Sequence, residues 1–492
     1  MRHPSGVLIQ LFPLGSRIPG TFQETRNTSK SLWSVRSSKL LSEMEKEYGP
    51  YVEGLNTRRT WELYERAAKV MPGGASSHSQ CFPVFDPYPL CFDRGKGSHI
   101  WDVDGNEYID FILSMGPCIL GHCHPKLMQA AREQLEKGTA FAVLNETEVK
   151  LAELVCKIVP NAEMVRFSNS GAEATMHAIR FARGYTGKDK IIKFEGAYHG
   201  AHDYVLLGGL GTPALGSEIS PDKIKPSWGI PDDTLRTVIL LPWNNLDVLE
   251  KTLRRHSNEI AAVITEPVLM NIGTVLPEEG YLKGIQDLCH EYDVVFILDE
   301  VISGFRLALG GAQEYFSLKP DLATYAKALG AGFPISAITG KKEIMEQVVP
   351  GKIMHAGTYN ANPLCVAAAY ATLNILGAND GQIYQRLHKV GFGLQKALEE
   401  AVEKTGTEAI VQGVGPGGCQ LYFTKMKKIR NYRDFFSCDT QKYLRFSKQM
   451  LKRHIYFHPQ QNEHLFVCTE HTDEDVAQAG RAASESLKTI AG

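Results

Sequence analysis

Short runs of apolar residues alternate with longer amphipathic stretches through the middle of this chain. Five runs rich in β-branched and aromatic residues predict strands, at 164–167, 191–194, 238–241, 261–264 and 294–298. Stretches with the helical spacing of apolar positions lie between them, at 172–185, 246–255 and 280–292. This alternation is typical of an α/β fold, in which a mainly parallel sheet is covered by helices on both faces.

The two ends of the chain follow different patterns. Residues 41–71 have amphipathic helical spacing, and 92–111 is typical of strands joined by the turn Asp104-Gly105-Asn106. Beyond 376, long charged helices predominate, with strand candidates at 418–423 and 465–468. We therefore predict a large domain with a seven-stranded sheet and a smaller α+β domain. The expected divisions are a disordered extension (1–45), a first segment of the small domain (46–115), the large domain (116–375) and the rest of the small domain (376–492).

The length and composition narrow the class of protein. With 492 residues, the chain is too long for one compact core. A net charge of −2 argues against a nucleic-acid surface, and no apolar run approaches the roughly 20 residues of a membrane helix. Ten cysteines without a CxxC pair fit a reducing compartment, so we expect a cytoplasmic protein without a disulfide framework.

Two local features leave alternatives open. The first forty residues carry six arginines and lysines against one acid, Glu24, which is similar to an organelle transit peptide. A plain disordered extension is the other interpretation. Gly121-His122-Cys123-His124-Pro125 contains metal-ligating residue types, but ligands this close in sequence rarely close a tetrahedral site. We therefore expect a structural turn there and no metal.

An acid and a lysine stand at the expected carboxyl edge of the sheet, where open α/β sheets bind ligands. The apolar run 294–298 ends in Asp299-Glu300, and Lys327 follows in a Gly-rich turn. A lysine can form a Schiff base with a pyridinium cofactor while an aspartate keeps the ring nitrogen protonated. The pair predicts a pyridoxal 5'-phosphate site, although strand-end acids and loop lysines are also common without one.

Three further strand ends carry groups that suit the same cofactor. Ser170-Gly171-Ala172 opens a helix whose N–H groups can bind a phosphate, or Ser170 can simply cap that helix together with Glu173. Tyr198, between two glycines, can lay its ring on a flat cofactor, a contact worth about 1 kcal/mol, or can fill space beside a turn. Glu266 follows another predicted strand and is a candidate for an indirect contact with the substituents of the cofactor ring.

Two other segments bear on the site. Thr358 precedes a small-residue helix, where it is a candidate phosphate donor or part of an ordinary helix start. The Gly-, Ser- and Pro-rich stretch 207–231 predicts a mobile lid. Its glycines do not form GxGxxG and no strand leads closely into them, which argues against a Rossmann dinucleotide site.

Taken in order, these residues resemble the class III (subgroup II) aminotransferases of the fold type I superfamily of pyridoxal-phosphate enzymes. Within that family the chain most resembles the glutamate-1-semialdehyde 2,1-aminomutases. The resemblance runs from about 61 to 476 and rests on WDVDGNEYID (101–110), MVRFSNSGAEA (164–174), YTGKDKIIKFEGAYHG (185–200) and GFRLALGGAQEYF (304–316).

The resemblance implies roles for the cofactor residues. Lys327 forms the Schiff base and moves the proton, Asp299 pairs with the pyridine nitrogen, and Tyr198 stacks on the ring. The phosphate is held by Ser170, Gly171 and Ala172.

The resemblance also implies partners and substrate contacts. Thr358 reaches the phosphate of a neighbouring subunit, which implies a homodimer with shared sites. Ser77, Asn244 and Glu463 match positions near the substrate in the aminomutases.

Three departures from the aminomutase pattern fall on substrate recognition. In PGGASSHSQCF (72–82), Gln80 stands where the aminomutases carry an arginine that binds the substrate carboxylate. Losing that charge-assisted bond would weaken carboxylate binding by about 1.5–3 kcal/mol. Met115 replaces a tryptophan of the family, and 207–231 differs from the aminomutase loop.

Three arginines stay open as replacements for the missing one. Arg58 and Arg59 stand at an expected solvated helix start, and Arg306 is interpreted as a structural ion-pair partner near a strand end.

The sequence therefore predicts a pyridoxal-phosphate aminotransferase acting between an amino acid or amine and a carbonyl acceptor. The main alternative is glutamate-1-semialdehyde 2,1-aminomutase, which forms 5-aminolevulinate and must retain its intermediate under a lid. An epimerase on the same scaffold and a non-catalytic dimerisation module are further alternatives. The presence of both Lys327 and Asp299 argues against the module.

Overall fold

The computed structural model describes residues 51–52, 54–81, 88–209 and 211–491. The chain divides into a first unit, Met1–Arg58, and a second unit, Arg59–Gly492. The described part of the first unit contains an antiparallel pair, β1 (Tyr51–Val52) and β2 (Leu55–Asn56). The expected extension 1–45, with its possible targeting role, lies outside the described residues. Of the helix predicted over 41–71, only Arg58–Val70 is helical among the described residues, as α2; the prediction is wrong for 51–56, where β1 and β2 lie.

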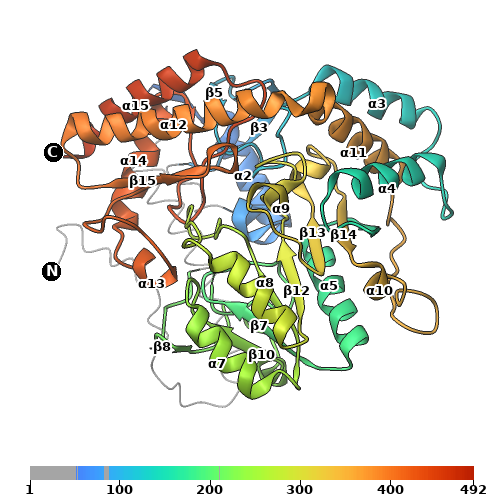
Figure 1. The fold of residues 1–492 in the computed structure, drawn as a ribbon. Coiled ribbons are helices and arrows are strands. Elements are labelled where there is room, and N and C mark those ends of the chain that lie inside the picture. The colour runs from blue at the N-terminus through green and yellow to red at the C-terminus, as the bar shows by residue number, and fades with distance from the viewer. Residues whose placement is uncertain (1–50, 53, 82–87, 210, 492) are drawn as a thin grey trace. The chain divides into compact units, whose positions relative to one another are not determined.

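Seven strands form the central sheet of the second unit, in the order β10-β7-β11-β12-β13-β14-β6 (Figure 1). Their bounds are β6 (Met164–Ser168), β7 (Lys190–Phe194), β10 (Val238–Leu241), β11 (Ile260–Thr265), β12 (Val295–Asp299), β13 (Leu322–Tyr325) and β14 (Ser336–Gly340). Only β14 runs antiparallel to its neighbours, β13 and β6. The prediction of a mainly parallel seven-stranded sheet is confirmed. The five predicted runs did not include β13 and β14, whose small and polar residues weaken the apolar signal.

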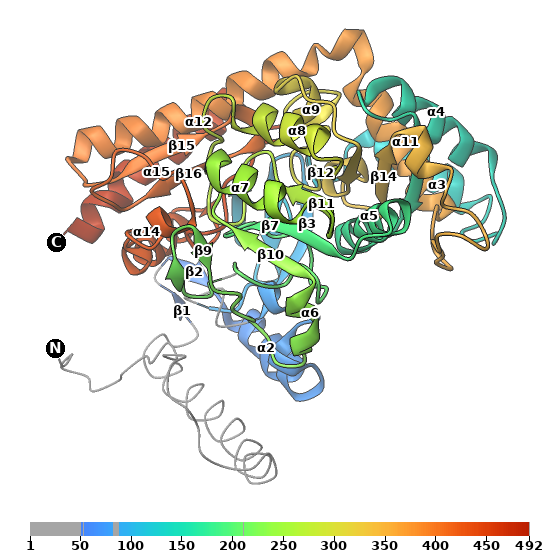
Figure 2. The ribbon, with the colours of Figure 1, turned by 60° about the horizontal axis from the view of Figure 1, so that its bottom comes forward.

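Alternating residues of the central strands pack against two helical layers. Val295 and Ile297 share a core cluster with α5 (Gly171–Thr186). Phe296 and Leu298 share another with α7 (Leu246–His256) and α8 (Tyr281–Glu291), which cover the sheet in Figure 2. Because both faces are covered, every residue of β12 is buried, which explains its continuous apolar sequence.

A second, four-stranded sheet has the order β17-β5-β4-β3. It is made of β3 (Phe92–Lys96), β4 (His99–Asp102), β5 (Glu107–Asp110) and β17 (Ile455–Tyr456). The predicted turn at 104–106 joins the antiparallel strands β4 and β5, whereas β17 pairs in parallel with β5. This sheet brings residues before 115 together with residues after 376. The exact domain limits remain a prediction.

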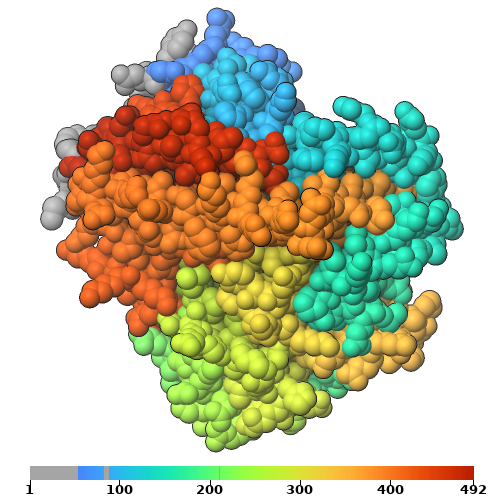
Figure 3. All heavy atoms as spheres, turned by 45° about the horizontal axis from the view of Figure 1, so that its top comes forward, coloured from blue at the N-terminus to red at the C-terminus, as the bar shows by residue number. Residues whose placement is uncertain are grey.

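Long helices cover this part of the molecule. α12 (Ile383–Thr405) and α15 (Asp473–Ala491) lie side by side at the surface (Figure 3), next to α14 (Thr440–Lys452). The predicted strand at 418–423 is present as β16 (Cys419–Tyr422), which pairs with β15 (Ile410–Gly413). At 465–468 the structure has no strand, only an isolated bridge between Leu465 and Cys419.

Shorter elements complete the described chain. They are α3 (Pro125–Leu135), α4 (Glu146–Ile158), α6 (Asp232–Arg236), α9 (Gly311–Tyr315), α10 (Lys342–Met345), α11 (Pro363–Leu376), α13 (Tyr432–Phe435), β8 (Gly216–Ser217), β9 (Ser220–Pro221) and the 3-10 helices η1 (Pro72–Gly74), η2 (His78–Gln80), η3 (Lys327–Leu329), η4 (Ala378–Gly381) and η5 (Gly415–Gly417). No helix within the described ranges has the length and apolar character needed to cross a membrane.

Candidate active site

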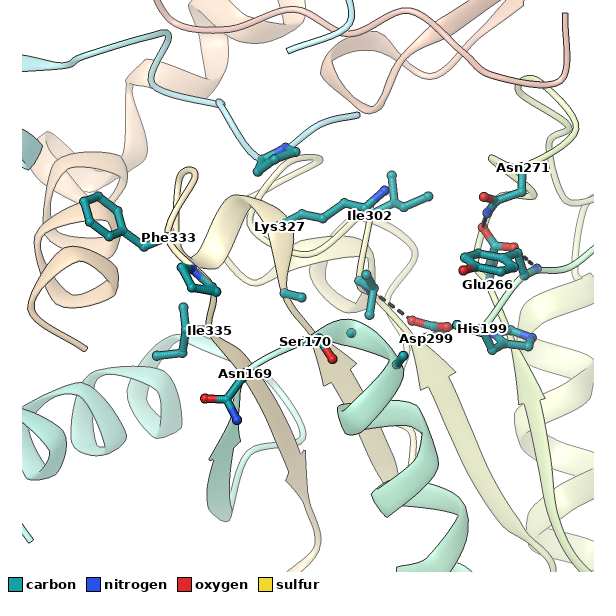
Figure 4. Close-up of a pocket in the computed structure, with 18 of the residues that line it drawn as sticks. Asn169, Ser170, His199, Glu266, Asn271, Asp299, Ile302, Lys327, Phe333 and Ile335 are labelled. Atoms are coloured by element: carbon teal, nitrogen blue, oxygen red, sulfur yellow. Dashed lines mark hydrogen bonds and ion pairs between the residues drawn. The ribbon is translucent and has the colours of Figure 1, made fainter. Parts of the chain in front are cut away.

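A cavity of about 370 Å³ lies at the carboxyl edge of the central sheet, where β12 ends. Its lining brings together the predicted residues Ser170, Gly171, Ala172, Tyr198, Glu266, Asp299 and Lys327. Figure 4 shows Lys327, Ser170, Asp299 and Glu266 converging on it from four different elements. These side chains are therefore neighbours in space although up to 157 positions separate them in sequence (327 − 170).

Lys327 begins η3, directly after β13. Its φ of 40° lies in the left-handed region, which a non-glycine residue enters at a cost of about 1–3 kcal/mol. Burial lowers the pKa of the Lys327 ammonium, against the opposing effect of the Glu463 and Glu266 carboxylates. A larger share of the side chain is consequently the neutral amine, the nucleophilic form that a Schiff base requires.

Asp299, the last residue of β12, is surrounded by hydrogen-bond donors. His199 Nδ1 lies 2.7 Å from Oδ2 of the carboxylate. Val301 N–H and the Thr324 hydroxyl both donate to Oδ1 at 3.0 Å. Three donors hold the buried carboxylate in one orientation at the cavity wall, where it can bind a protonated ring nitrogen.

His199 is a functional candidate that the sequence interpretation missed. The residue is 2% exposed, and burial lowers its pKa, against the opposing hydrogen bond to Asp299. The neutral imidazole donates through Nδ1 to the carboxylate, which leaves Nε2 buried without a partner among the described residues. The available signal was its position, directly after Tyr198 in the same strand-end turn.

Glu266 follows β11 (Ile260–Thr265) and is also buried. Its Oε1 accepts from Tyr198 N–H at 2.9 Å, and its Oε2 accepts from Met270 N–H at 3.2 Å and from Asn271 Nδ2 at 3.1 Å. Burial raises the pKa of the Glu266 carboxyl to about 8, against the lowering effect of these three bonds. Through these hydrogen bonds, Glu266 orients the backbone at Tyr198 and at Met270.

The turn before α5 supplies N–H groups for an anion. Ser170 Oγ caps the helix by accepting from Glu173 N–H at 3.2 Å. The Glu173 carboxylate accepts from Asn169 N–H at 2.7 Å, so the predicted capping box is displaced by one residue. Among the described residues, the N–H groups of Ser170, Gly171 and Ala172 consequently have no acceptor. Such free donors at a helix N-terminus bind phosphate.

Two glycines permit close packing around this turn. A Cβ added to Gly171 would lie 2.8 Å from Val301 Cγ1. Gly200 has a φ of 103°, and its Cβ would lie 2.6 Å from Ala172 Cα. A larger residue at Gly200 would therefore push the turn bearing Tyr198 away from the helix N-terminus.

Thr358 is exposed and does not line the cavity. Its segment is nevertheless tied to the cavity rim at two points. His355 Nε2 lies 2.9 Å from Ser168 Oγ, and Asn360 Oδ1 accepts from Asn169 Nδ2 at 3.1 Å. These contacts hold Thr358 at the surface, next to the cavity of the same chain.

Ser77 and Gln80 are exposed, and neither contributes to the cavity lining. Gln80 instead lines a smaller hollow of about 280 Å³ between α2 and residues 89–91. The structure therefore does not bring these two substrate candidates to the acid–lysine pair.

Asn244 is occupied within the fold. Its Nδ2 donates to the carbonyl oxygens of Leu276 and Arg430 at 3.2 and 2.8 Å, and its Oδ1 accepts from Glu278 N–H. Glu463 does not line the cavity, but its carboxylate lies near enough to Lys327 to affect the lysine pKa. Of these two candidates, only Glu463 acts electrostatically on the site.

Met115 lies in a turn of four consecutive left-handed residues, 113–116, with φ between 50° and 104°. The next residue, Pro117, lines the cavity. Arg306 binds this turn by donating to the carbonyl oxygen of Gly116, and it also donates to Pro416 O at 3.1 Å and Val467 O at 2.9 Å.

The interpretation of Arg306 as an ion-pair partner is wrong. The side chain is completely buried, and none of the ion pairs between described residues includes it. Its two terminal nitrogens donate to three carbonyl oxygens instead, whereas Nε is buried without a partner among the described residues. The planar fork of donors can thus join three separate backbone segments. Arg306 is therefore unavailable to a substrate carboxylate.

The described part of the predicted lid, 207–231, contains the β8–β9 hairpin and is bound by α13. Tyr432 Oη donates to Thr212 O at 2.6 Å. Arg433 donates to the carbonyl oxygens of residues 215–217 at 3.1–3.2 Å and pairs with Glu195 at 3.1 Å. None of the described residues of 207–231 lines the cavity. The mobility of this segment remains a prediction.

Comparison with known proteins places this site in a family. The pattern of the family described as "Aminotransferase class-III" matches residues 83–419. The chain belongs to the class-III aminotransferase family. It is 44% identical over 433 residues to a protein named glutamate-1-semialdehyde 2,1-aminomutase from Methanothermobacter thermautotrophicus, across 87% of this chain and 99% of that protein.

Solved structures share the fold of this class-III aminotransferase. An omega-transaminase from Sphaerobacter thermophilus superposes with a TM-score of 0.82 at 32% identity, over 88% of this chain and 98% of that chain. A transaminase with bound PLP superposes with a TM-score of 0.79 at 29% identity, over 89% and 98%. The fold is type I of the pyridoxal-phosphate enzymes, and the protein is a PLP-dependent enzyme.

The residues of the cavity fit this cofactor group by group. Free N–H groups at the start of α5 suit its phosphate, the Asp299 carboxylate suits a protonated pyridine nitrogen, and the Lys327 amine suits its aldehyde. The bound pyridine ring supplies an electron sink that stabilises negative charge on the adjacent substrate carbon.

Proposed function

We propose that this class-III aminotransferase is a glutamate-1-semialdehyde 2,1-aminomutase. Such an enzyme moves the amino group from carbon 2 to carbon 1 and so forms 5-aminolevulinate. The observation that supports this proposal is the 44% identity to a relative of that name over nearly its whole length. This identity is stronger support than the three departures from the aminomutase pattern, which favoured an intermolecular aminotransferase.

Several residues of the cavity have roles in the proposed reaction. Lys327 Nζ would bind the cofactor aldehyde and, once released, would move a proton between the substrate carbon and the cofactor carbon to which the lysine had been joined. Asp299 keeps the ring nitrogen protonated, and His199 holds Asp299 in place by its 2.7 Å contact. Tyr198 covers one face of the ring.

The other predicted cofactor residues bind the phosphate or orient the backbone of the site. Ser170, Gly171 and Ala172 bind the phosphate through their free N–H groups and the Ser170 hydroxyl. Glu266 orients the backbone of Tyr198.

The decisive experiment mixes the purified enzyme, loaded with PLP, with synthetic glutamate-1-semialdehyde. Rapid formation of 5-aminolevulinate supports the aminomutase. The matched control is Lys327→Ala, which should form no product above the uncatalysed background. Absence of product with the wild-type enzyme, while its cofactor absorbance responds to amino acids or amines, would overturn the aminomutase proposal.

An intermolecular aminotransferase is the second candidate, favoured by Gln80. This residue stands in place of the carboxylate-binding arginine and is exposed outside the cavity. The buried Arg306 does not replace that arginine. For this candidate, a panel of amino donors should convert the cofactor to its amine form in the absence of any semialdehyde, and a carbonyl acceptor should reverse the change.

We further propose a homodimer in which Thr358 serves the phosphate site of the partner subunit. Thr358 is held beside its own cavity rim but outside it, and its neighbours Met354 and Tyr359 are 69% and 64% exposed. An apolar surface next to a functional threonine is suited to cover by a second copy of the chain.

Mixed dimers test this arrangement. Lys327→Ala and Thr358→Ala chains, each impaired alone, should regain activity when unfolded together and reassembled, because one of the two shared sites is then intact. Failure to regain activity in dimers that contain one chain of each kind would contradict a role for Thr358 across the interface.

A further inference from the structure

Lys193 is a lysine in the interior of a central strand. It is the fourth residue of β7, and its exposed fraction is zero. An ammonium in such a place costs several kcal/mol unless its charge and its donors are compensated. The cofactor contacts described above do not explain why the chain places a lysine there.

The donors of Lys193 are used on two backbone segments. Its Nζ donates to the carbonyl oxygens of Ala197, at 3.0 Å, and of Leu207. Ala197 directly precedes Tyr198, which lines the cavity. The buried ammonium thus joins the turn that carries Tyr198 to the start of the segment 207–231.

Two acidic side chains act on the buried amine of Lys193. Burial lowers the pKa of Lys193 to about 7, against the opposing effect of Glu266 and Glu195. Glu266 Oε1 in turn accepts from Tyr198 N–H at 2.9 Å. The carbonyl of Ala197 and the N–H of Tyr198 belong to the same peptide unit. One buried cation and one buried acid therefore hold the two ends of a single peptide unit.

We propose that Lys193 is a positioning residue for the cofactor: together with Glu266 it fixes the Ala197–Tyr198 peptide unit and so aims the Tyr198 ring at the pyridine ring. A peptide unit bound at both its C=O and its N–H cannot rotate, and this sets the direction of the Tyr198 side chain. The inference rests on the proposed contact between Tyr198 and PLP. It is independent of the substrate.

The test measures the dissociation constant of PLP from apoenzyme. Lys193→Met should weaken PLP binding at least tenfold, because the peptide unit then loses one of its two anchors. Lys190→Met is the matched control: Lys190 lies on the same strand but pairs with Glu259 at the surface, so this variant should bind PLP within twofold of the wild type.

Melting curves with and without PLP separate positioning from plain stability. A tenfold loss of affinity reduces the stabilisation conferred by excess PLP by about 1.4 kcal/mol. If Lys193 matters only for packing, Lys193→Met will lower the stability of apoenzyme and holoenzyme equally and leave the dissociation constant unchanged. That result would overturn the proposal.

A double-mutant cycle with Tyr198→Ala tests the route of the effect. Tyr198→Ala should weaken PLP binding, and Lys193→Met should add less than twofold in that background, because the two residues act as one. Fully additive losses would overturn the proposal. If Lys193→Met does not fold, Lys193→Gln enters the same cycle with the same criteria.

The cycle also distinguishes two kinds of failure. If Tyr198→Ala binds PLP as the wild type does, the role proposed for Tyr198 is wrong, and the inference about Lys193 fails with it. If Tyr198→Ala weakens binding but Lys193→Met does not, only the inference about Lys193 fails.

Discussion

Replacing His199 by phenylalanine removes one of the three donors that hold the Asp299 carboxylate. The contact is 2.7 Å long, and both side chains are buried, so water does not readily replace it. A hydrogen bond to a charged group contributes about 1.5–3 kcal/mol, which corresponds to roughly a 10- to 150-fold change. We expect the kcat/KM of the PLP-saturated enzyme to fall by that factor, with glutamate-1-semialdehyde as substrate.

The assay uses two comparison variants. His199→Asn keeps an N–H donor and should recover part of the lost activity. His177→Phe removes another buried histidine, which contacts Arg180 and the His355 ring instead of the cavity, and should stay within twofold of the wild type. If His199→Phe also stays within twofold, the reasoning that His199 orients Asp299 is refuted.

Three further predictions concern stability and local order. Burial opposes the His122 imidazolium, but the hydrogen bonds and charges of Asp110 and Cys118 together raise the His122 pKa to about 10. Since an unfolded histidine has a pKa of about 6.5, this stabilisation is complete below pH 6.5 and is lost as the pH rises through 10. The wild type should therefore lose more of its urea-unfolding free energy than His122→Gln between pH 6 and pH 10, and equal losses would contradict the ion pair. Arg433→Ala should release 215–217 and create a site of rapid proteolysis there, whereas an unchanged cleavage pattern would show that this anchor is dispensable. Gly200→Ala places a Cβ against the backbone of Ala172 at a φ of 103°, a strain that costs about 1–3 kcal/mol of folding free energy. The variant should therefore have a lower melting temperature and a lower affinity for PLP. Wild-type values for both would rule out the close approach of Gly200 to Ala172.

The outline of the fold was predictable because local patterns carry it. Strands such as β12 are buried on both faces, so their sequences are continuous apolar runs that periodicity detects. The strands β13 and β14 escaped detection, since their small residues pack under helices without a strong apolar signal. The missed strand β14 is also the antiparallel one, whose direction depends on pairing with distant partners.

The candidate site was predictable to the extent that its residues stand at strand ends. Lys327, Asp299, Tyr198 and the turn at 170–172 do so, and all of them line one cavity. His199 was overlooked because a histidine in a turn has no distinctive pattern until its partner is known. Gln80, singled out for its residue type alone, lies outside that cavity.

By itself, the sequence indicated the class of fold, the cofactor and the candidate residues that line the cavity, because strand ends, helix starts and residue chemistry are local properties. Only the tertiary structure decided which charges are buried and what compensates them. Arg306 binds three carbonyl oxygens instead of an acid, and Lys193 holds the peptide unit of Tyr198 from inside the sheet. Such partners come from segments up to 190 residues apart, so the free energy of placing these charges in the interior depends on contacts that no local pattern contains.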